Sequence, residues 1–424
     1  MSGRILTSDP AEDGAIVTAA RRPSVGNSAR AYLERVRGGD MGALPAVLGL
    51  VVLCTVFAVL KPVFLTPVNF ANLFQQGGQV TVIAMGLVFV LLIGEIDLSA
   101  GFASGLCAAV LAVTLTGMGL PWYVCVLAAI LTGVVIGLVL GVLVAKLGIP
   151  SFIVTLAGFL AFQGVLLAIL EEGTNISIRD ETILAIANKN LPAALGWALW
   201  LVGVGGYAAV QITRSVKRSG RGLVADPFSL IAARVGTLAV LTGVAVFVLN
   251  LERSRNPAVA SLSGVPVVIP IVLALLVVWT FVLGRTRFGR HLYAVGGNAE
   301  ASRRAGINVD RIKVSAFVIC SAIAAVGGII AASRGASVDP NTGGSQVLLY
   351  AVGAAVIGGT SLFGGKGRVL DAVLGGAVIA VIDNGMGLLG FASSEKFMVT
   401  GSVLLLAAGV DALARRRAAA AGLR

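Results

Sequence analysis

Long apolar runs alternate with short polar segments along most of the chain. A bilayer core of about 30 Å is crossed by roughly 20 residues of α-helix, and many of the runs have about that length. We therefore predict an all-α polytopic membrane protein with about twelve transmembrane helices, within a range of ten to twelve. The predicted helices lie at residues 44–61, 77–94, 99–117, 121–145, 151–170, 193–213, 229–250, 265–283, 314–333, 346–364, 369–389 and 397–412.

Two of the predicted helices meet at a short polar segment between Gly94 and Ser99, where glycine interrupts the apolar pattern. Short, interrupted runs are typical of broken or re-entrant helices. A weak internal echo accompanies this segment, because residues 93–101 and 357–365 share Ile, Gly, Leu and Gly in the same register. Each copy ends one apolar run and precedes a Gly/Ala-rich one, which indicates an internal duplication of the kind found in transporters.

The composition excludes the main alternatives to a membrane protein. Hydrophobic residues make up 57% of the chain and charged residues 12%, with a mean hydropathy of +0.96. A soluble domain carries about 25% charged residues, and a disordered chain needs low hydrophobicity. The net charge of +12 is explained by basic loops on the cytoplasmic side of a membrane, so it does not indicate a nucleic-acid partner.

The distribution of Lys and Arg predicts the orientation of the chain. If the N-terminus is cytoplasmic and the passes alternate, most of the 32 Lys and Arg residues fall on the cytoplasmic side, as the positive-inside rule requires. Both termini are then cytoplasmic. We predict a polar tail at 1–43, a membrane domain at 44–414 with its longest cytoplasmic loop at 284–313, and a basic tail at 415–424. The first tail lacks the apolar segment of a signal peptide.

Polar residues within or beside the apolar runs are the candidates for chemistry. A carboxylate at membrane depth costs about 2.5–3.5 kcal/mol, so it usually faces a cavity or a partner. Glu95 and Asp97 can therefore line a translocation path, or they can form a tight turn in which Asp97 and Ser99 cap the next helix. Asn384, beside Asp383, can bind substrate hydroxyl groups or can tie two helices together.

The loop at 284–313 is too patterned to be a plain connector. Asn298 can cap a short helix that Gly306 ends, and Arg303 and Arg304 give that helix positive charge. A short helix at the membrane surface can dock in a groove of another protein. The alternative is a basic loop whose only role is to fix the topology.

Several chemistries are missing from the sequence. The segment around Lys366 lacks the first glycine and the final hydroxyl of a phosphate-binding loop. His291 is the only histidine, and no nucleophile lies beside a general base, so we predict no catalytic residue and no metal site. The cysteines show no paired spacing and are interpreted as small buried residues; they are Cys54, Cys107, Cys125 and Cys320.

The sequence resembles a known family in the loop at 284–313 and in several other segments. Glu300, Ala301, Ser302 and Gly306 match the coupling motif E-A-A-x-x-x-G of ABC importer permeases, with serine where the family often has a second alanine. Five segments in order resemble the monosaccharide branch of these permeases: EIDLSAG (95–101), PSFIVTLAGFLAFQG (150–164), AVGGNAEASRRAGINV (294–309), VIGGTSLFGGKG (356–367) and IDNGMGLLG (382–390). The predicted helices at about 193–250 form a two-helix insertion that resembles that of the xylose-type permeases.

The resemblance implies an ABC importer permease fold in a bacterial cell membrane, assembled as a homodimer with a central path for xylose or a related monosaccharide. Two copies of an ATP-binding subunit, or a tandem form, would dock beneath it and would bind ATP and Mg, so no cofactor is expected in this chain. An extracytoplasmic sugar-binding protein would deliver the substrate. The residues implied in coupling to the ATPase are Asn298, Glu300, Ala301, Ser302, Arg303, Arg304 and Gly306. The candidates for the substrate pathway are Glu95, Asp97, Ser99, Thr360, Ser361 and Asn384.

Three other classes of protein compete with this interpretation. An ion-coupled secondary transporter would use Glu95, Asp97 and Asp383 as coupling groups. A membrane-embedded enzyme would need a catalytic cluster at one depth, which the sequence does not offer. A structural scaffold would leave the patterned segment at 289–313 without a role. The coupling motif favours the importer.

Overall fold

The computed structural model describes residues 44–170, 174–223, 225, 227–257 and 261–420. The polar tail predicted at 1–43 lies outside the described residues, as do the last four residues of the chain. The described elements are α2 (Leu44–Leu60), η1 (Pro62–Leu65), α3 (Pro67–Leu92), α4 (Ala100–Ala112), η2 (Val113–Gly117), α5 (Trp122–Ala145), α6 (Ser151–Leu170), β1 (Ile176–Ser177), α7 (Glu181–Asn188), β2 (Asn190–Leu191), α8 (Ala193–Ser219), α9 (Phe228–Asn250), β3 (Val265–Pro266), α10 (Val268–Arg285), α11 (Arg287–Gly297), α12 (Ala299–Arg304), α13 (Val309–Gly335), β4 (Ser337–Val338), α14 (Ser345–Ile357), α15 (Val369–Leu388) and α16 (Ser393–Ala420).

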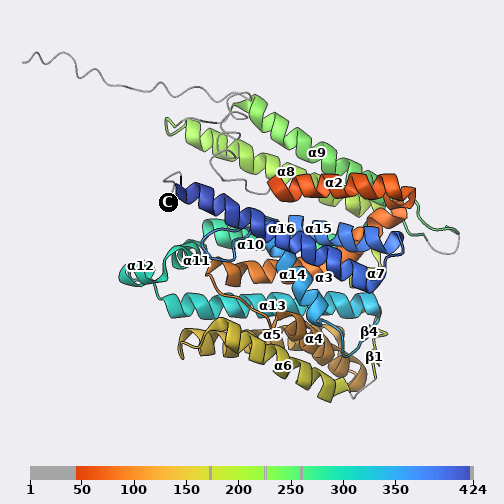
Figure 1. Cartoon of the computed structure of the whole chain (residues 1–424). Coiled ribbons are helices and arrows are strands. Elements are labelled where there is room, and N and C mark those ends of the chain that lie inside the picture. Colours follow the sequence, from red (N-terminus) through yellow and green to blue (C-terminus); the bar gives the residue numbers. More distant parts are fainter. Residues whose placement is uncertain (1–43, 171–173, 224, 226, 258–260, 421–424) are drawn as a thin grey trace, which may run out of the picture.

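The long helices lie side by side along one common direction (Figure 1). Each of the predicted apolar runs overlaps a helix, so the predicted helical class is confirmed. Nine helices of the described chain are long and apolar enough to cross a membrane, and α2 and α14 are shorter apolar helices. The four strands of the described chain are each two residues long and connect loops. Strand β1 pairs with β4 and β2 pairs with β3, and both pairs are antiparallel.

Several helix boundaries differ from the predicted ones, and three of them differ by seven residues or more. Helix α3 begins at Pro67 rather than 77, because Thr66 accepts a hydrogen bond from the backbone of Asn69 and proline occupies the first turn. Helix α14 ends at Ile357 rather than 364, since Gly359 takes a positive φ of 117° soon afterwards. Helix α16 continues to Ala420, beyond the predicted end of the membrane domain.

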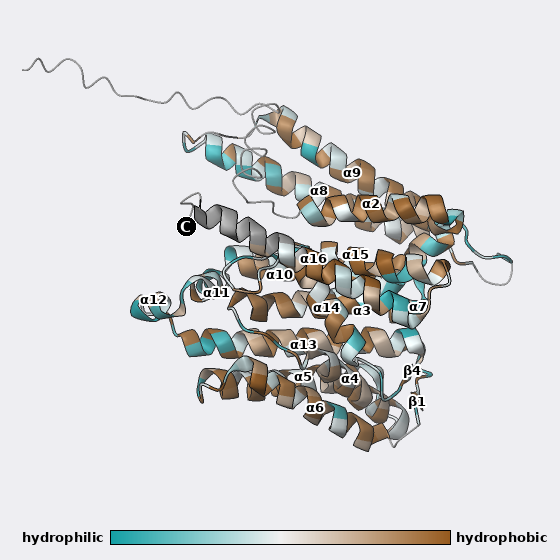
Figure 2. Cartoon of the chain, in the orientation of Figure 1, coloured by the Kyte–Doolittle hydropathy of each residue, from teal (hydrophilic) through white to brown (hydrophobic). Residues whose placement is uncertain are grey.

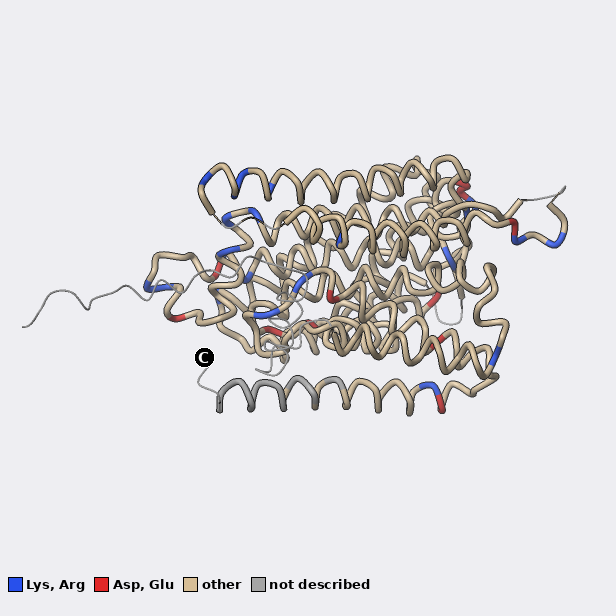
Figure 3. The backbone as a smooth tube through the Cα atoms, turned by 90° about the horizontal axis from the view of Figure 1, so that it is seen from above, with Lys and Arg blue, Asp and Glu red and all other residues tan. Residues whose placement is uncertain are grey.

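The centre of the bundle is formed by α3, α4, α13 and α15. Inside the most apolar window of α3, 83% of residues are buried, whereas the figure is 6% for both α8 and α9. Figure 2 shows that these outer helices are also largely hydrophobic. Apolar side chains that face outward, such as Leu201, Val202 and Phe247, fit a lipid environment. In Figure 3 most Lys and Arg residues lie near the ends of the helices.

The predicted two-helix insertion is a hairpin at the edge of the bundle. Helices α8 and α9 pack mainly against each other, and the indole of Trp200 donates hydrogen bonds to Ala239 O (3.2 Å) and Thr242 Oγ1 (3.0 Å). The pairing of β2 with β3 closes the base of the hairpin. The hairpin therefore adds to the bundle without entering its core.

A stripe of glycines on α5 packs inside the chain. A Cβ atom at Gly133 or Gly137 would lie 2.5 Å from the carbonyl oxygen of Ser321 or Phe317, both on α13. The absence of side chains lets the two backbones approach closely, as is common between membrane helices. This stripe therefore serves packing within one chain, against α13.

Two irregular segments interrupt the central helices and position the candidate site. The first break is defined as residues 93–99, between α3 and α4, and the second break as residues 358–368, between α14 and α15. The second break contacts the end of α3 and the first break, since the backbone N–H of Gly365 donates to Leu92 O at 2.8 Å and a Cβ atom at Gly364 would lie 3.0 Å from the backbone nitrogen of Gly94. The segments that carry the internal sequence echo thus meet at one place in the fold.

Candidate functional site

The predicted short helix in the long basic loop is present as α12, which projects from one end of the bundle (Figure 1). Asn298 caps it, because its Oδ1 accepts a hydrogen bond from the backbone N–H of Ala301 at 2.8 Å. Gly306 leaves the helix with a φ of 81°. Both local predictions are confirmed.

Helix α12 presents charge on its exposed side. Glu300 pairs with Arg303 (3.5 Å) and Arg304 (3.3 Å), and the three side chains are 61%, 60% and 80% exposed. Ser302 faces the body of the protein and is buried, while Ala301 is exposed. Exposed ion pairs of this kind contribute little to folding stability. These charges are therefore available to an interacting protein.

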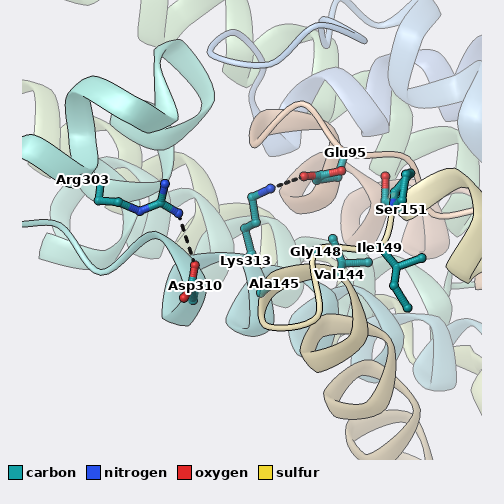
Figure 4. A pocket seen from close by; sticks show the side chains of 10 residues that line it. Glu95, Val144, Ala145, Gly148, Ile149, Ser151, Arg303, Asp310 and Lys313 are labelled. Atoms are coloured by element: carbon teal, nitrogen blue, oxygen red, sulfur yellow. Dashed lines mark hydrogen bonds and ion pairs between the residues drawn. The ribbon is translucent and has the colours of Figure 1, made fainter.

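A small cavity of about 250 Å³ lies between α12, the base of α13 and the loop that joins α5 to α6. Figure 4 shows two ion pairs in its wall. Arg303 pairs with Asp310 at 3.5 Å, which ties α12 to α13, and Lys313 pairs with Glu95 of the first break. Glu95, predicted as a pathway candidate, is thus placed beside the predicted coupling helix.

Asp97 holds the first break from inside the protein. Its fully buried carboxylate accepts hydrogen bonds from the backbone N–H and the hydroxyl of Ser99, at 2.8 and 2.6 Å. The thiol of Cys320 on α13 lies 3.6 Å from the same carboxylate. The predicted cap by Ser99 is therefore not formed, because its hydroxyl donates to Asp97 and makes no capping bond to α4; Asp97 instead bonds to the residue that directly precedes the helix.

Helix α6 supports the same break from the other side. The hydroxyl of Ser151 accepts a hydrogen bond from the backbone N–H of Ile96 at 3.4 Å, and the hydroxyl of Thr155 donates to Ile96 O at 3.2 Å. Because α6 holds its backbone and α13 contacts the side chains of Glu95 and Asp97, the first break has a defined shape.

The second break buries two predicted pathway residues, Thr360 and Ser361. The backbone of Ser361 donates to Lys366 O at 2.8 Å, and its hydroxyl accepts from the backbone N–H of Phe363 at 3.2 Å. Thr360 Oγ1 is buried and has no hydrogen-bond partner among the residues that the structure describes. A buried hydroxyl in that condition is uncommon and costs stability.

Asn384 lies apart from this group, in a cluster of amides between α3 and α15. It exchanges two hydrogen bonds of 2.9 Å with Asn69 and donates a third, of 3.2 Å, to Gln76. The neighbouring Asp383 pairs with Lys396 of α16 at 3.4 Å. In this conformation the amide of Asn384 is used to join helices.

Sequence reasoning missed four residues that organise these contacts: Asp310, Lys313, Cys320 and Tyr293. Lys313 and Cys320 are seven residues apart on α13, hence on one helix face, and they contact Glu95 and Asp97. That spacing was the available signal. Tyr293 of α11 donates its hydroxyl to Gly367 O at 2.7 Å. Burial, followed by the charge of Asp371, raises the pKa of Tyr293, which is consistent with a hydroxyl that acts as a donor.

The described residues include no group of three or more His, Cys, Asp or Glu side chains that could hold a metal ion. The arrangement is suited to transmitting movement. An exposed charged helix at one end is connected by ion pairs and backbone contacts to two breaks in the central helices. Such connected elements can pass a movement from a surface to the interior.

Comparison with known proteins agrees with this geometry. The family model described as "Branched-chain amino acid transport system / permease component" matches residues 69–408. The chain is 36% identical over 354 residues to the xylose transport system permease protein of Escherichia coli strain K12, covering 84% of this chain and 87% of that protein. It is 34% identical over 348 residues to the xylose transport system permease protein of Haemophilus influenzae, covering 82% and 90%.

The ribose import permease protein of Escherichia coli strain K12 is 32% identical over 367 residues, which cover 86% of this chain and 92% of that protein. No solved structure matches the chain. The resemblance to transport permeases, which was inferred from the sequence motifs, is confirmed. The chain belongs to the branched-chain amino acid transport system permease component family and is a membrane-spanning permease component of a transport system.

Proposed function

We propose that this chain is the membrane permease subunit of an ATP-driven sugar importer whose substrate is xylose or a related monosaccharide. The observation that carries the proposal is the 36% identity over 354 residues to a xylose permease protein. Similarity to ribose permease proteins is lower, at 32%, which favours xylose within the sugars.

In this proposal the chain crosses the cell membrane twelve times with both termini in the cytoplasm. The end of α16 lies at the same end of the bundle as α12 (Figure 1), which is consistent with an even number of passes between them. The basic residues of the loops near α12 support a cytoplasmic location for that end.

Helix α12 is the docking element for a separate ATP-binding subunit, which binds ATP and Mg and needs no cofactor from this chain. Glu300, Arg303 and Arg304 are proposed to meet charges on that subunit, because their mutual pairs are exposed and weak. Asn298 and Gly306 fix the two ends of the helix, Ser302 seats it on the protein, and Ala301 leaves space for the partner.

A second copy of this chain is proposed to complete the substrate path, and an extracytoplasmic sugar-binding protein to deliver the sugar. Thr360 is the leading candidate for contact with sugar, since its buried hydroxyl lacks a partner among the described residues. Ser361 and Ser99 supply further hydroxyls near the breaks. Glu95 and Asp97 shape the first break, and Asn384 joins the helices on the far side of the path.

The test is uptake of labelled xylose into proteoliposomes that contain this chain, its ATP-binding subunit and the sugar-binding protein. Uptake is expected only with all three components and ATP. Glu300→Lys should reduce it at least tenfold, because two adjacent arginines then face a third positive charge. Glu181→Lys is the matched control: it breaks an exposed ion pair with Lys189, also 3.3 Å long, at the opposite end of the bundle.

Two outcomes would overturn the proposal. Uptake driven by a proton or sodium gradient in the absence of the ATP-binding subunit would return Glu95, Asp97 and Asp383 to the role of ion-coupling groups. ATP-dependent uptake of leucine or isoleucine in place of xylose and ribose would assign the other substrate class that the family description contains.

A further inference from the structure

The last turn of α11 makes an unusually close contact with the end of α3. A Cβ atom at Gly296 would lie 1.7 Å from Leu92 O and 2.7 Å from the backbone nitrogen of Gly365. No side chain fits in that space, so the contact is backbone against backbone. Only glycine permits α11 to occupy this position.

The second break meets the other two segments at the same point. The N–H of Gly365 donates to Leu92 O at 2.8 Å. A Cβ atom at Gly364 would lie 2.7 Å from Gly296 O and 3.0 Å from the backbone nitrogen of Gly94 in the first break. The end of α11 is thus in contact with the beginning of the first break and with the second break at once.

A side-chain contact one turn earlier strengthens the attachment. The hydroxyl of Tyr293 donates to Gly367 O at 2.7 Å, near the end of the second break. At the next residue, Gly297, a Cβ atom would meet no atom within 4 Å outside its own helix and its chain neighbours. The contact is therefore specific to one face of α11.

Helix α12 follows α11 directly, with only Asn298 between the two helices. We propose that α11 carries the movement of α12 to both breaks, and that Gly296 and Tyr293 are the positioning residues of that connection. This inference rests on the proposed function, in which the ATP-binding subunit acts on α12. A contact between backbones cannot be relieved by a change of side-chain rotamer, so α11 and the two breaks shift together.

The ion pairs around the cavity form a separate connection. They join α12 to α13 through Arg303 and Asp310, and α13 to the first break through Lys313 and Glu95. Neither pair contacts the second break. Of these connections, only the one through α11 can therefore move the second break together with α12.

The experiment compares Gly296→Ala with Gly297→Ala in the complete transport complex. Both changes add one methyl group to adjacent helical glycines, but only the first meets backbone atoms. The expected result for Gly296→Ala is a loss of at least tenfold in xylose transported per ATP hydrolysed, with the ATP-binding subunit still bound. Gly297→Ala should transport as the unaltered complex does.

A second measurement follows the second break itself. Phe363→Cys places a thiol on its exposed part, in a Cys54→Ala background that removes the native cysteine with partial exposure. ATP should change the rate at which this thiol is labelled, and Gly296→Ala should abolish the change. Persistence of the ATP-dependent change in Gly296→Ala would overturn the inference.

Tyr293→Phe keeps the proposal testable if Gly296→Ala fails to assemble, because it removes only one hydroxyl. It is expected to lower transport per ATP several-fold and to reduce the labelling change. If Tyr293→Phe and all assembled variants behave as the unaltered complex, the inference is refuted while the proposed function stands. If the unaltered complex transports no sugar, the proposed function fails instead.

Discussion

The amide cluster that contains Asn384 offers the sharpest test of a site residue. Replacing Asn384 with alanine removes three hydrogen bonds, two to Asn69 and one to Gln76. Hydrogen bonds between membrane helices contribute about 0.6 kcal/mol each on average and at most about 1.7. Asn69 cannot turn away to find another partner easily, because its amide nitrogen also donates to Phe64 O at 3.0 Å.

The expected loss of unfolding free energy for Asn384→Ala is therefore about 2 kcal/mol. Denaturation of the purified protein in mixed micelles measures it. Asn69→Ala should cause a similar loss, and the double variant should lose about 1.2 kcal/mol less than the sum, since two of the bonds are shared. Asp383→Ala is the control: the adjacent acid makes one partly exposed ion pair with Lys396, so its removal should cost about 1 kcal/mol or less.

Transport kinetics distinguish this structural role from a role in binding sugar. If Asn384 mainly joins α3 to α15, the variant should transport with an unchanged KM at temperatures at which it stays folded. An unchanged stability together with a KM raised tenfold would refute the reasoning. It would show that the amide contacts substrate and that its helix contacts are dispensable.

Three further predictions concern the breaks and the loop after α9. Thr360→Val should raise stability by about 1 kcal/mol, because it removes an unpartnered buried hydroxyl, and should raise the KM for xylose. Glu95→Lys should destabilise the protein by about 2 kcal/mol, and combining it with Lys313→Glu should restore most of the loss in the same micelle assay. Hydrogen bonds, first that from the Ser261 hydroxyl, lower the pKa of Glu252 to about 2. The folded loop is therefore stabilised above the ordinary carboxyl pKa and loses that stabilisation as pH falls towards 2. Ser261→Ala raises this pKa, so pepsin should cleave the loop at a higher pH.

Each of these predictions has a result that contradicts it. Ser321→Ala is the control for Thr360→Val, since Ser321 Oγ on α13 is also buried without a partner among the described residues; an equal rise in KM in both would remove Thr360 from the path. No recovery in the charge-swapped variant would show that Glu95 and Lys313 act separately. A pepsin profile that Ser261→Ala leaves unchanged would show that Glu252 does not hold the loop.

The sequence predicts most of the helices, because a membrane makes hydrophobic length a sufficient signal. The start of α3 was missed for a physical reason. Its first turns contain Asn69, Gln75 and Gln76, which appear polar in a hydropathy pattern. In the structure Asn69 and Gln76 bond to Asn384 across the helix interface, and such a long-range partner is invisible in a local window.

The candidate site also contains parts that the sequence predicts and parts that it does not. Helix α12 was predictable residue by residue, since its cap at Asn298 and its exit at Gly306 are local signals. The pairing of Glu95 with Lys313 joins residues 218 positions apart. The contact of Gly296 with Leu92 joins residues 204 positions apart and involves no side chain on the glycine. The spacing of Lys313 and Cys320 on one face of α13 is the only sequence signal for the first contact, and no periodic or charge pattern marks the second.

The two connections that leave α12 differ in how they can respond to force. Ion pairs can separate and form again with other partners or with water. The cost is modest for the exposed Arg303–Asp310 pair and higher for the more buried Glu95–Lys313 pair. The packed backbones at Gly296 and Leu92 can only move together or lose the contact altogether. We therefore expect the ion pairs to exchange between the two conformations of the transporter while the α11 contact persists in both. On that reasoning, substitutions at the ion pairs should shift the balance between conformations, whereas Gly296→Ala should disconnect ATP hydrolysis from transport.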